Sequence, residues 1–131
     1  MKREKGIHIM LDLYGVEPEK LDDAIFLNKL ISKAVTQSGL KSFGTLYHKF
    51  VPMGFTSITL LEASHISIHT WPEYKHATID IFACDKWEKA LKAADIIIEG
   101  LNPKKLKKVV KSRGYIYNPE ATPTYIAEKN E

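Results

Sequence analysis

Alternation of apolar and polar residues along the segment 6–13 is the feature that most constrains this fold. The apolar residues share one parity: Ile7, Ile9, Leu11 and Leu13. A period of two places them on one face of a β-strand whose other face is more polar. Further segments with strand character follow, at 42–50, 55–62, 66–71, 78–84 and 107–115. The sequence therefore predicts a sheet built from several short strands.

Two other segments have the three-and-four spacing of an amphipathic helix. The first begins after Pro18, near the carboxylates of Asp22 and Asp23, and ends at Gly39, which suits the left-handed conformation that terminates helices. The second spans residues 86–101. Two helices between runs of strands predict an α+β fold, in which an antiparallel sheet carries both helices on one face.

The opposite face of this sheet is expected to be covered by a second copy of the chain. Segments such as 59–61 and 78–82 contain too many apolar side chains for a sheet that is half in water. We therefore expect a homodimer in which two sheets pack face to face as an αββα sandwich.

Length and composition indicate one domain. The chain has 131 residues, of which 44% are hydrophobic and one, Cys84, is a cysteine. We expect a single domain at residues 1–115, followed by a mobile tail at 116–131. A lone cysteine excludes an internal disulfide and indicates a reducing, cytoplasmic location. No run approaches the roughly 18–20 apolar residues of a membrane helix, so no membrane span is expected.

Six basic residues lie within the segment 104–113, although the whole chain has a net charge of only +3. A basic run of this kind is compatible with nucleic-acid binding, but aromatic residues for base stacking are not interleaved with it. A solvated face is the favoured interpretation, and no nucleic-acid partner is expected.

Histidine, serine and cysteine residues in the middle of the chain raise three chemical possibilities. A metal site is disfavoured because His65 and His69 lie on an expected strand, where four residues span roughly 13 Å. A hydrolytic triad of Ser64, His69 and Asp80 is disfavoured because the sequence has no Gly-x-Ser-x-Gly elbow. Cys84 is either a reactive thiol or a small buried hydrophobic residue at a strand end.

The block 64–74 carries the most specific signal. It reads Ser-His-Ile-Ser-Ile-His-Thr-Trp-Pro-Glu-Tyr, and it resembles the signature of the pyruvoyl-dependent S-adenosylmethionine decarboxylases, in their small prokaryotic and archaeal branch. Other segments match the family in the same order: Gly-Ile-His-Ile, Leu-Tyr-Gly, Leu-Asp-Asp, His-Lys-Phe-Val-Pro-Met-Gly and Ala-Thr-Ile-Asp-Ile-Phe-Ala-Cys. The resemblance covers roughly residues 6–115.

The resemblance implies an enzyme that makes its own cofactor. The Ser64 hydroxyl would attack the carbonyl of Ala63, and the cleaved chain would carry a pyruvoyl group derived from Ser64. His69 would move protons during cleavage, and Thr56 would assist at a position where the family has serine. The ketone would form a Schiff base with the amine of S-adenosylmethionine and accept electrons as carbon dioxide leaves, with no metal. The product would be the aminopropyl donor for spermidine and other polyamines.

The resemblance also assigns residues to the substrate. Cys84 would reprotonate the substrate carbon after decarboxylation. Glu73 would hold the ribose hydroxyls, Phe50 would stack on adenine, and Trp71 would line the same pocket or pack structurally.

Besides Thr56, Ala63 and Asp85 also differ from the family pattern. Ala63 stands where the family has glutamate, and the carboxylate is displaced to Glu62, which strand parity would turn to the opposite face. Asp85 follows Cys84 where the family has glycine. Two alternatives therefore stay open: a non-cleaving relative that acts as a binding or regulatory subunit, and a pyruvoyl-dependent arginine decarboxylase.

Overall fold

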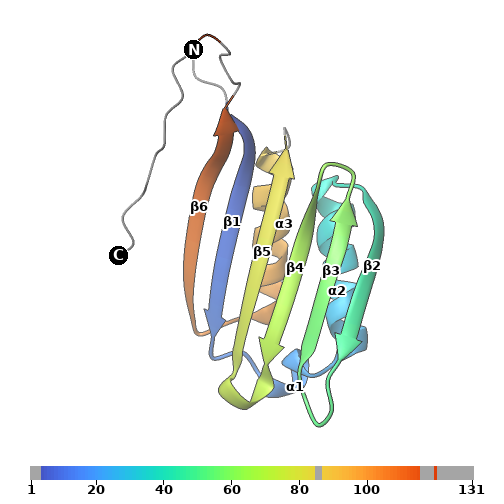
Figure 1. Cartoon of the computed structure of the whole chain (residues 1–131). Helices are drawn as coiled ribbons and strands as arrows, with labels where there is room; N and C mark the ends of the chain where they lie inside the picture. The colour runs from blue at the N-terminus through green and yellow to red at the C-terminus, as the bar shows by residue number, and fades with distance from the viewer. Residues whose placement is uncertain (1–3, 85–86, 116–119, 121–131) are drawn as a thin grey trace.

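The computed structural model describes residues 4–84, 87–115 and 120. Six strands form one antiparallel sheet in the order β2-β3-β4-β5-β1-β6 (Figure 1). The strands are β1 (Glu4–Tyr14), β2 (Ser42–Lys49), β3 (Phe55–Leu61), β4 (Ser64–Trp71), β5 (His76–Cys84) and β6 (Lys105–Tyr115). The helices are α1 (Pro18–Leu21), α2 (Ala24–Ser38), α3 (Trp87–Leu101) and the single 3₁₀ turn η1 (Pro72–Tyr74).

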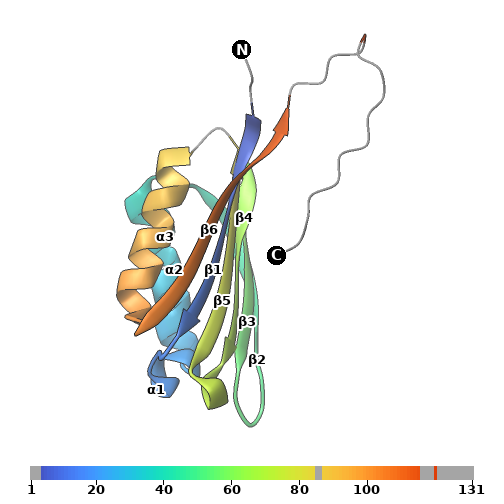
Figure 2. The same ribbon diagram turned by 90° about the vertical axis from the view of Figure 1, so that its left-hand side faces the viewer.

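Helices α2 and α3 cover one face of the sheet, as Figure 2 shows, which confirms the predicted α+β fold. The alternating apolar residues of β1 point to this layer and are fully buried. Every second residue of β5 is buried as well, from Ala77 to Ala83. We call the helix-free side the open face. Strand parity places His8, Met10, Thr78 and Asp80 there.

The first predicted helix corresponds to α2, and a short helix that was not predicted, α1, precedes it. Pro18 occupies the first turn of α1, and Asp22 caps its C-terminal end. Asp23 then caps α2, accepting the Phe26 N–H at 3.0 Å. Gly39 ends α2 with φ of 87°, as its conformational freedom predicted. The two adjacent carboxylates therefore have separate roles.

The β3–β4 connection is tighter than the sequence indicated. Leu61 pairs with Ser64, so Glu62 and Ala63 alone form the turn, and β4 begins two residues before the predicted strand. Glu62 is a turn residue, so strand parity does not set its direction, and it borders the same cavity as Ala63 and Ser64.

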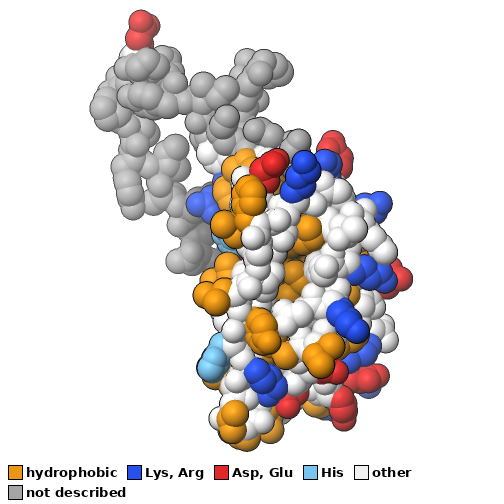
Figure 3. Space-filling model, turned by 90° about the vertical axis from the view of Figure 1, so that its right-hand side faces the viewer, with side chains coloured by type: hydrophobic (Ala, Val, Ile, Leu, Met, Phe, Trp, Pro, Cys, Tyr) orange, Lys and Arg blue, Asp and Glu red, His pale blue; other side chains and the backbone are white. Residues whose placement is uncertain are grey.

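The open face retains large exposed apolar side chains, among them Leu46, Ile58, Leu60 and Trp71. Figure 3, which looks onto the edge of the molecule formed by β2, shows hydrophobic side chains exposed on that side. The predicted homodimer would cover them. The basic segment forms the edge strand β6, where Lys108 pairs with Asp95 at 3.7 Å.

The predicted mobile tail falls on residues 116–119 and 121–131, outside the described residues, as does Asp85. Over the described part of the chain, no helix is long and apolar enough to cross a membrane.

Candidate functional site

Ser64 lies at the tip of the β3–β4 hairpin, next to the peptide bond that the sequence marks for cleavage. Its partners in the sheet are Leu61 on β3 and Ala83 on β5, both buried against the helices. Ser64 therefore points to the helix side and is half-buried. The backbone N–H of Glu62 donates to the Lys41 carbonyl at 2.9 Å, which ties the hairpin to the start of β2.

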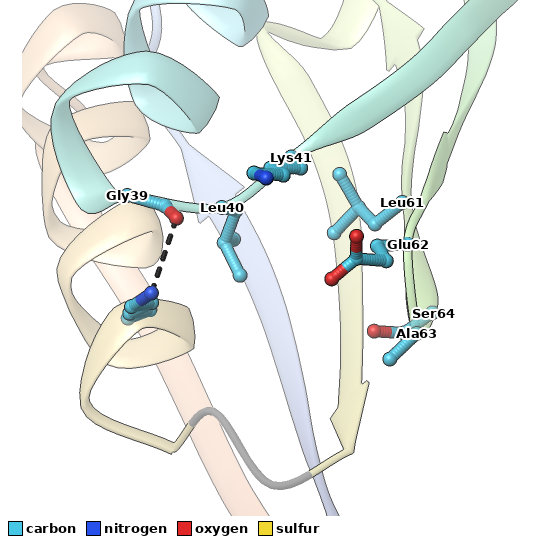
Figure 4. Close-up of a pocket in the computed structure, with 8 residues that line it drawn as sticks. Gly39, Leu40, Lys41, Leu61, Glu62, Ala63 and Ser64 are labelled. Carbon is cyan, nitrogen blue, oxygen red and sulfur yellow. Dashed lines mark hydrogen bonds between the residues drawn. The ribbon is translucent and has the colours of Figure 1, made fainter.

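A cavity of about 200 Å³ adjoins this hairpin (Figure 4). Glu62, Ala63 and Ser64 form one wall. Gly39 and Lys89 form part of another, where the Lys89 ammonium donates to the Gly39 carbonyl at 3.3 Å. Ser64 and the Ala63–Ser64 peptide bond thus border a space that admits small groups.

Thr56 and His69 form a second cluster, on the open face. They are direct cross-strand partners on β3 and β4, and Thr56 Oγ1 lies 3.1 Å from His69 Nδ1. Both residues are half-buried. The tautomer of the ring decides which group donates in this hydrogen bond. The hydroxyl fixes the orientation of the imidazole, as proton transfer at a defined atom requires.

The residues expected to bind substrate lie at the same end of the sheet as His69. The Trp71 ring stands 6.5 Å from that of His69 and stacks on His76 at 5.3 Å. Glu73 follows on η1 and is exposed. Phe50, directly after β2, is 44% exposed and packs edge-on against His48 at 4.6 Å. An aromatic ring and a carboxylate are therefore both accessible here.

Cys84 lies at the opposite end, near Ser64. It ends β5, pairs with Gly6, and follows Ala83, the β5 partner of Ser64. Strand parity places it on the open face, and it is half-buried with a free thiol. Because the residue is only half-buried, a small molecule could reach the thiol.

The candidate residues thus fall into two groups at opposite ends of the sheet. Ser64 and Cys84 lie where β4 begins, whereas Thr56, His69, Trp71, Glu73 and Phe50 lie where it ends (Figure 1). Ser64 and His69 are five positions apart on β4, a distance of roughly 16 Å, and point to opposite faces. Within one chain, His69 does not reach the Ala63–Ser64 bond.

Asp22 and Lys49 form an ion pair that the sequence analysis did not assign to the site. Asp22 Oδ1 lies 2.6 Å from Lys49 Nζ and accepts the Gly54 N–H at 2.9 Å. These contacts with Lys49 and Gly54 lower the pKa of Asp22 below its ordinary value. The sequence placed Asp22 at a helix start, and only the distant partners reveal its other role.

The described residues contain no group of three or more His, Cys, Asp or Glu side chains that could hold a metal ion. In particular, His65 and His69 occupy β4, as the sequence predicted, rather than a helix on which they could chelate together.

Comparison with known proteins identifies the family. The profile of a family described as S-adenosylmethionine decarboxylase matches residues 7–114. A Persephonella marina protein named S-adenosylmethionine decarboxylase proenzyme is 43% identical over 123 residues, covering 93% of this chain and 92% of the relative. A Sulfurihydrogenibium protein of the same name is 43% identical over 121 residues, covering 92% of this chain and 91% of the relative.

A solved structure supports the same family assignment. The crystal structure of the adenosylmethionine decarboxylase from Aquifex aeolicus superimposes with a TM-score of 0.84 at 41% identity, covering 92% of this chain and 99% of that one. The matched region contains the Ser64 hairpin, the Thr56–His69 pair and Cys84. The chain therefore belongs to the S-adenosylmethionine decarboxylase family.

Proposed function

We propose that this protein is a self-processing, pyruvoyl-dependent decarboxylase of S-adenosylmethionine that supplies the aminopropyl donor for polyamine synthesis. The relatives' names, which include the word proenzyme, support both the substrate and the processing. The single observation that carries the proposal is the placement of Ser64 at the tip of a two-residue hairpin bordering a cavity. We place the reaction in the cytoplasm, where the Cys84 thiol stays reduced.

Self-processing uses groups that the chain itself supplies. Ser64 Oγ attacks the Ala63 carbonyl carbon, the C–N bond breaks, and the Ser64 nitrogen takes up the hydroxyl proton, so the peptide becomes an ester. Loss of the Ser64 α-proton then expels the Ala63 carboxylate. Water replaces the Ser64 nitrogen, which leaves as ammonia. The products are fragment 1–63 and fragment 64–131, the latter beginning with a pyruvoyl group.

The residues around Ser64 fit such a group. The cavity of about 200 Å³ on the helix side of Ser64 accommodates three carbons, and Cys84 lies at the same end of the sheet but on its open face. A pyruvoyl group supplies an electrophilic carbonyl that binds an amine and draws electrons from the breaking bond to the carboxylate. Cys84 Sγ would donate the proton to the substrate carbon.

The separation of Ser64 from His69 supports a homodimer with shared sites. If the open faces pack together about a twofold axis that runs across the strands, the His69 end of one sheet lies over the Ser64 end of the other. Exposed Leu46, Ile58 and Leu60 would be buried by this packing. Thr56 and His69 of one copy would then serve the Ala63–Ser64 bond of the other.

Complementation between two inactive variants tests this arrangement. His69→Ala and Ser64→Ala chains should each remain uncleaved when expressed alone. In a mixed dimer, the first variant provides Ser64 and the second provides His69, so the His69→Ala chain should be cleaved. An uncleaved His69→Ala chain in a mixed dimer, verified by native mass spectrometry, would contradict the shared site.

For substrate binding, we propose Phe50 against adenine, Glu73 on the ribose hydroxyls and Trp71 as a pocket wall. All three lie at the His69 end, and Phe50 and Glu73 are exposed. A planar ring and a carboxylate can hold adenine and ribose, but they could also hold the guanidinium of arginine. The names of the relatives favour S-adenosylmethionine as the substrate.

Intact mass spectrometry of the denatured, freshly purified protein tests the function as a whole. We expect two fragments that meet at Ala63 and Ser64, the second blocked to amino-terminal sequencing, and release of carbon dioxide from S-adenosylmethionine. Ser64→Ala should keep the fold and abolish cleavage. A single wild-type species that persists at 14.9 kDa would instead support a non-cleaving binding subunit.

A further inference from the structure

Asp22 holds the loop that carries Phe50, although it lies far from that loop in the sequence. Its Oδ1 accepts the N–H of Gly54 at 2.9 Å and contacts Lys49 Nζ at 2.6 Å. Lys49 Nζ also donates to the Phe50 carbonyl at 2.9 Å, and the Phe50 N–H donates to the Gly54 carbonyl at 2.9 Å. One carboxylate therefore fixes both ends of the β2–β3 loop, residues 50–54.

The same carboxylate borders the space beside Glu73. An open cavity of about 440 Å³ is lined by Asp22, by Met53 from the β2–β3 loop and by Glu73 from η1. Asp22 thus stands between the element that carries the aromatic ring and the element that carries the accessible carboxylate.

Asp22 is itself anchored to the strand that carries His69. Thr70, the next residue on β4, donates its hydroxyl to the Leu21 carbonyl at 2.7 Å, and Leu21 directly precedes Asp22. A continuous series of hydrogen bonds therefore runs from β4 through the end of α1 to the β2–β3 loop. The position of Phe50 relative to β4 depends on it.

We propose that Asp22 is a positioning residue for nucleoside recognition, which sets the placement of Phe50 relative to Glu73 through its bonds to Lys49 and Gly54. The inference rests on the proposed function, because Phe50 and Glu73 contact the nucleoside only in that reading. Asp22 does not touch Ser64 or His69, so it has no part in self-cleavage. Its effect is confined to substrate binding.

The first experiment compares Asp22→Asn with Asp23→Asn. Asn at position 22 keeps an acceptor for the Gly54 N–H but loses the charge that holds Lys49. We expect the KM for S-adenosylmethionine to rise about tenfold, with kcat and the rate of self-cleavage within about twofold of wild type. Asp23→Asn keeps the N-cap of α2 and should change none of these.

A nucleoside without the amino acid gives a second measurement. 5′-Methylthioadenosine shares adenine, ribose and sulfur with the substrate but cannot react with a carbonyl cofactor. Its dissociation constant, measured by calorimetry, should rise in Asp22→Asn by the same factor as the KM. Lys49→Gln should weaken it similarly, and the double variant should be no worse than either single one.

The outcomes separate this inference from the proposed function. A wild type that cleaves and turns over, with an unchanged KM in Asp22→Asn, would overturn the positioning role alone. A kcat or self-cleavage rate that falls together with binding would also overturn it, because general misfolding would then explain the loss. A wild type that does not cleave contradicts the proposed function, and the nucleoside titration of the uncleaved chains still decides the role of Asp22.

Discussion

Thr56 Oγ1 lies 3.1 Å from His69 Nδ1, and the register of β3 against β4 makes the two residues direct partners. The strand pairing alone brings them together, so the contact needs no loop or ligand to form. It also selects one orientation of the imidazole on the open face. The role proposed for the hydroxyl in processing is therefore to orient the imidazole of His69.

Thr56→Val should slow self-cleavage by about tenfold to a hundredfold. Valine keeps the shape of threonine but leaves His69 Nδ1 without its partner, so the ring loses its orientation for proton transfer. Thr56→Ser, which retains the hydroxyl, should cleave at close to the wild-type rate. The measurement is the fraction of cleaved chain against time in a denaturing gel or mass spectrum; equal rates in all three proteins would show that His69 needs no such orientation.

Cys84→Ala should be cleaved normally but lose turnover by about a hundredfold or more. The thiol is proposed to return a proton to the substrate carbon and has no assigned part in cleavage. Production of carbon dioxide and analysis of the nucleoside product check this. Cys84→Ser is the matched control for size, and because its hydroxyl is a far weaker acid it should also be slow. Unimpaired turnover in Cys84→Ala would assign the proton to another group.

The Asp22 interaction should respond to pH. Contacts with Lys49 and Gly54 hold the pKa of Asp22 below the ordinary value of 3.8. A group whose pKa falls on folding contributes stability above its unfolded pKa, and that contribution disappears as the pH falls through the lower, folded value. The stability difference between Ser64→Ala and Ser64→Ala/Asp22→Asn should therefore be present near neutral pH and shrink as the pH falls below the ordinary pKa of 3.8. Urea unfolding across this range measures it, and a pH-independent difference would contradict the assignment.

Gly100→Ala should destabilise the fold although alanine favours helices. A Cβ at Gly100 would lie 2.9 Å from Leu30 Cδ2 and closer still to Cδ1, where α3 meets α2. The cost of such overpacking, about 1–3 kcal/mol, exceeds the helix-propensity gain of about 1 kcal/mol. Urea unfolding in the Ser64→Ala background gives the difference. Adding Leu30→Ala should make the two changes less than additive, whereas full additivity would place the strain elsewhere.

Local sequence patterns predicted most of the fold. The period of two in β1 and the spacing of three and four in α2 each identify a buried face, and Gly39 marks the end of α2. The helix start near Asp23 was predicted, but the short helix α1 before it was not. The bonds from Asp22 to Lys49 and Gly54 also lie beyond any local pattern.

The candidate site was predicted as a set of residues but not as an arrangement. The signature around Ser64 and His69 named both residues, and the parity of a strand already implies that five positions separate opposite faces. The pairing of β4 with β3 and β5 is needed to place Ser64 and His69 at opposite ends of the sheet. The pairing of Thr56 with His69 depends on the two-residue turn at Glu62 and Ala63. This turn could not be predicted, because it contains no glycine or other residue typical of tight turns.

The strand order has a consequence for the cleaved protein. Fragment 1–63 would contribute β1, β2 and β3, and fragment 64–131 would contribute β4, β5 and β6, yet β1 lies between β5 and β6. The fragments are therefore interleaved: β3 with β4, β5 with β1, and β1 with β6 all join one fragment to the other. Cutting a single bond turns the folding of each protomer from a unimolecular reaction into a bimolecular one. The melting temperature of the cleaved protein would then depend on its concentration. Dilution after unfolding would slow the reassociation of the two fragments.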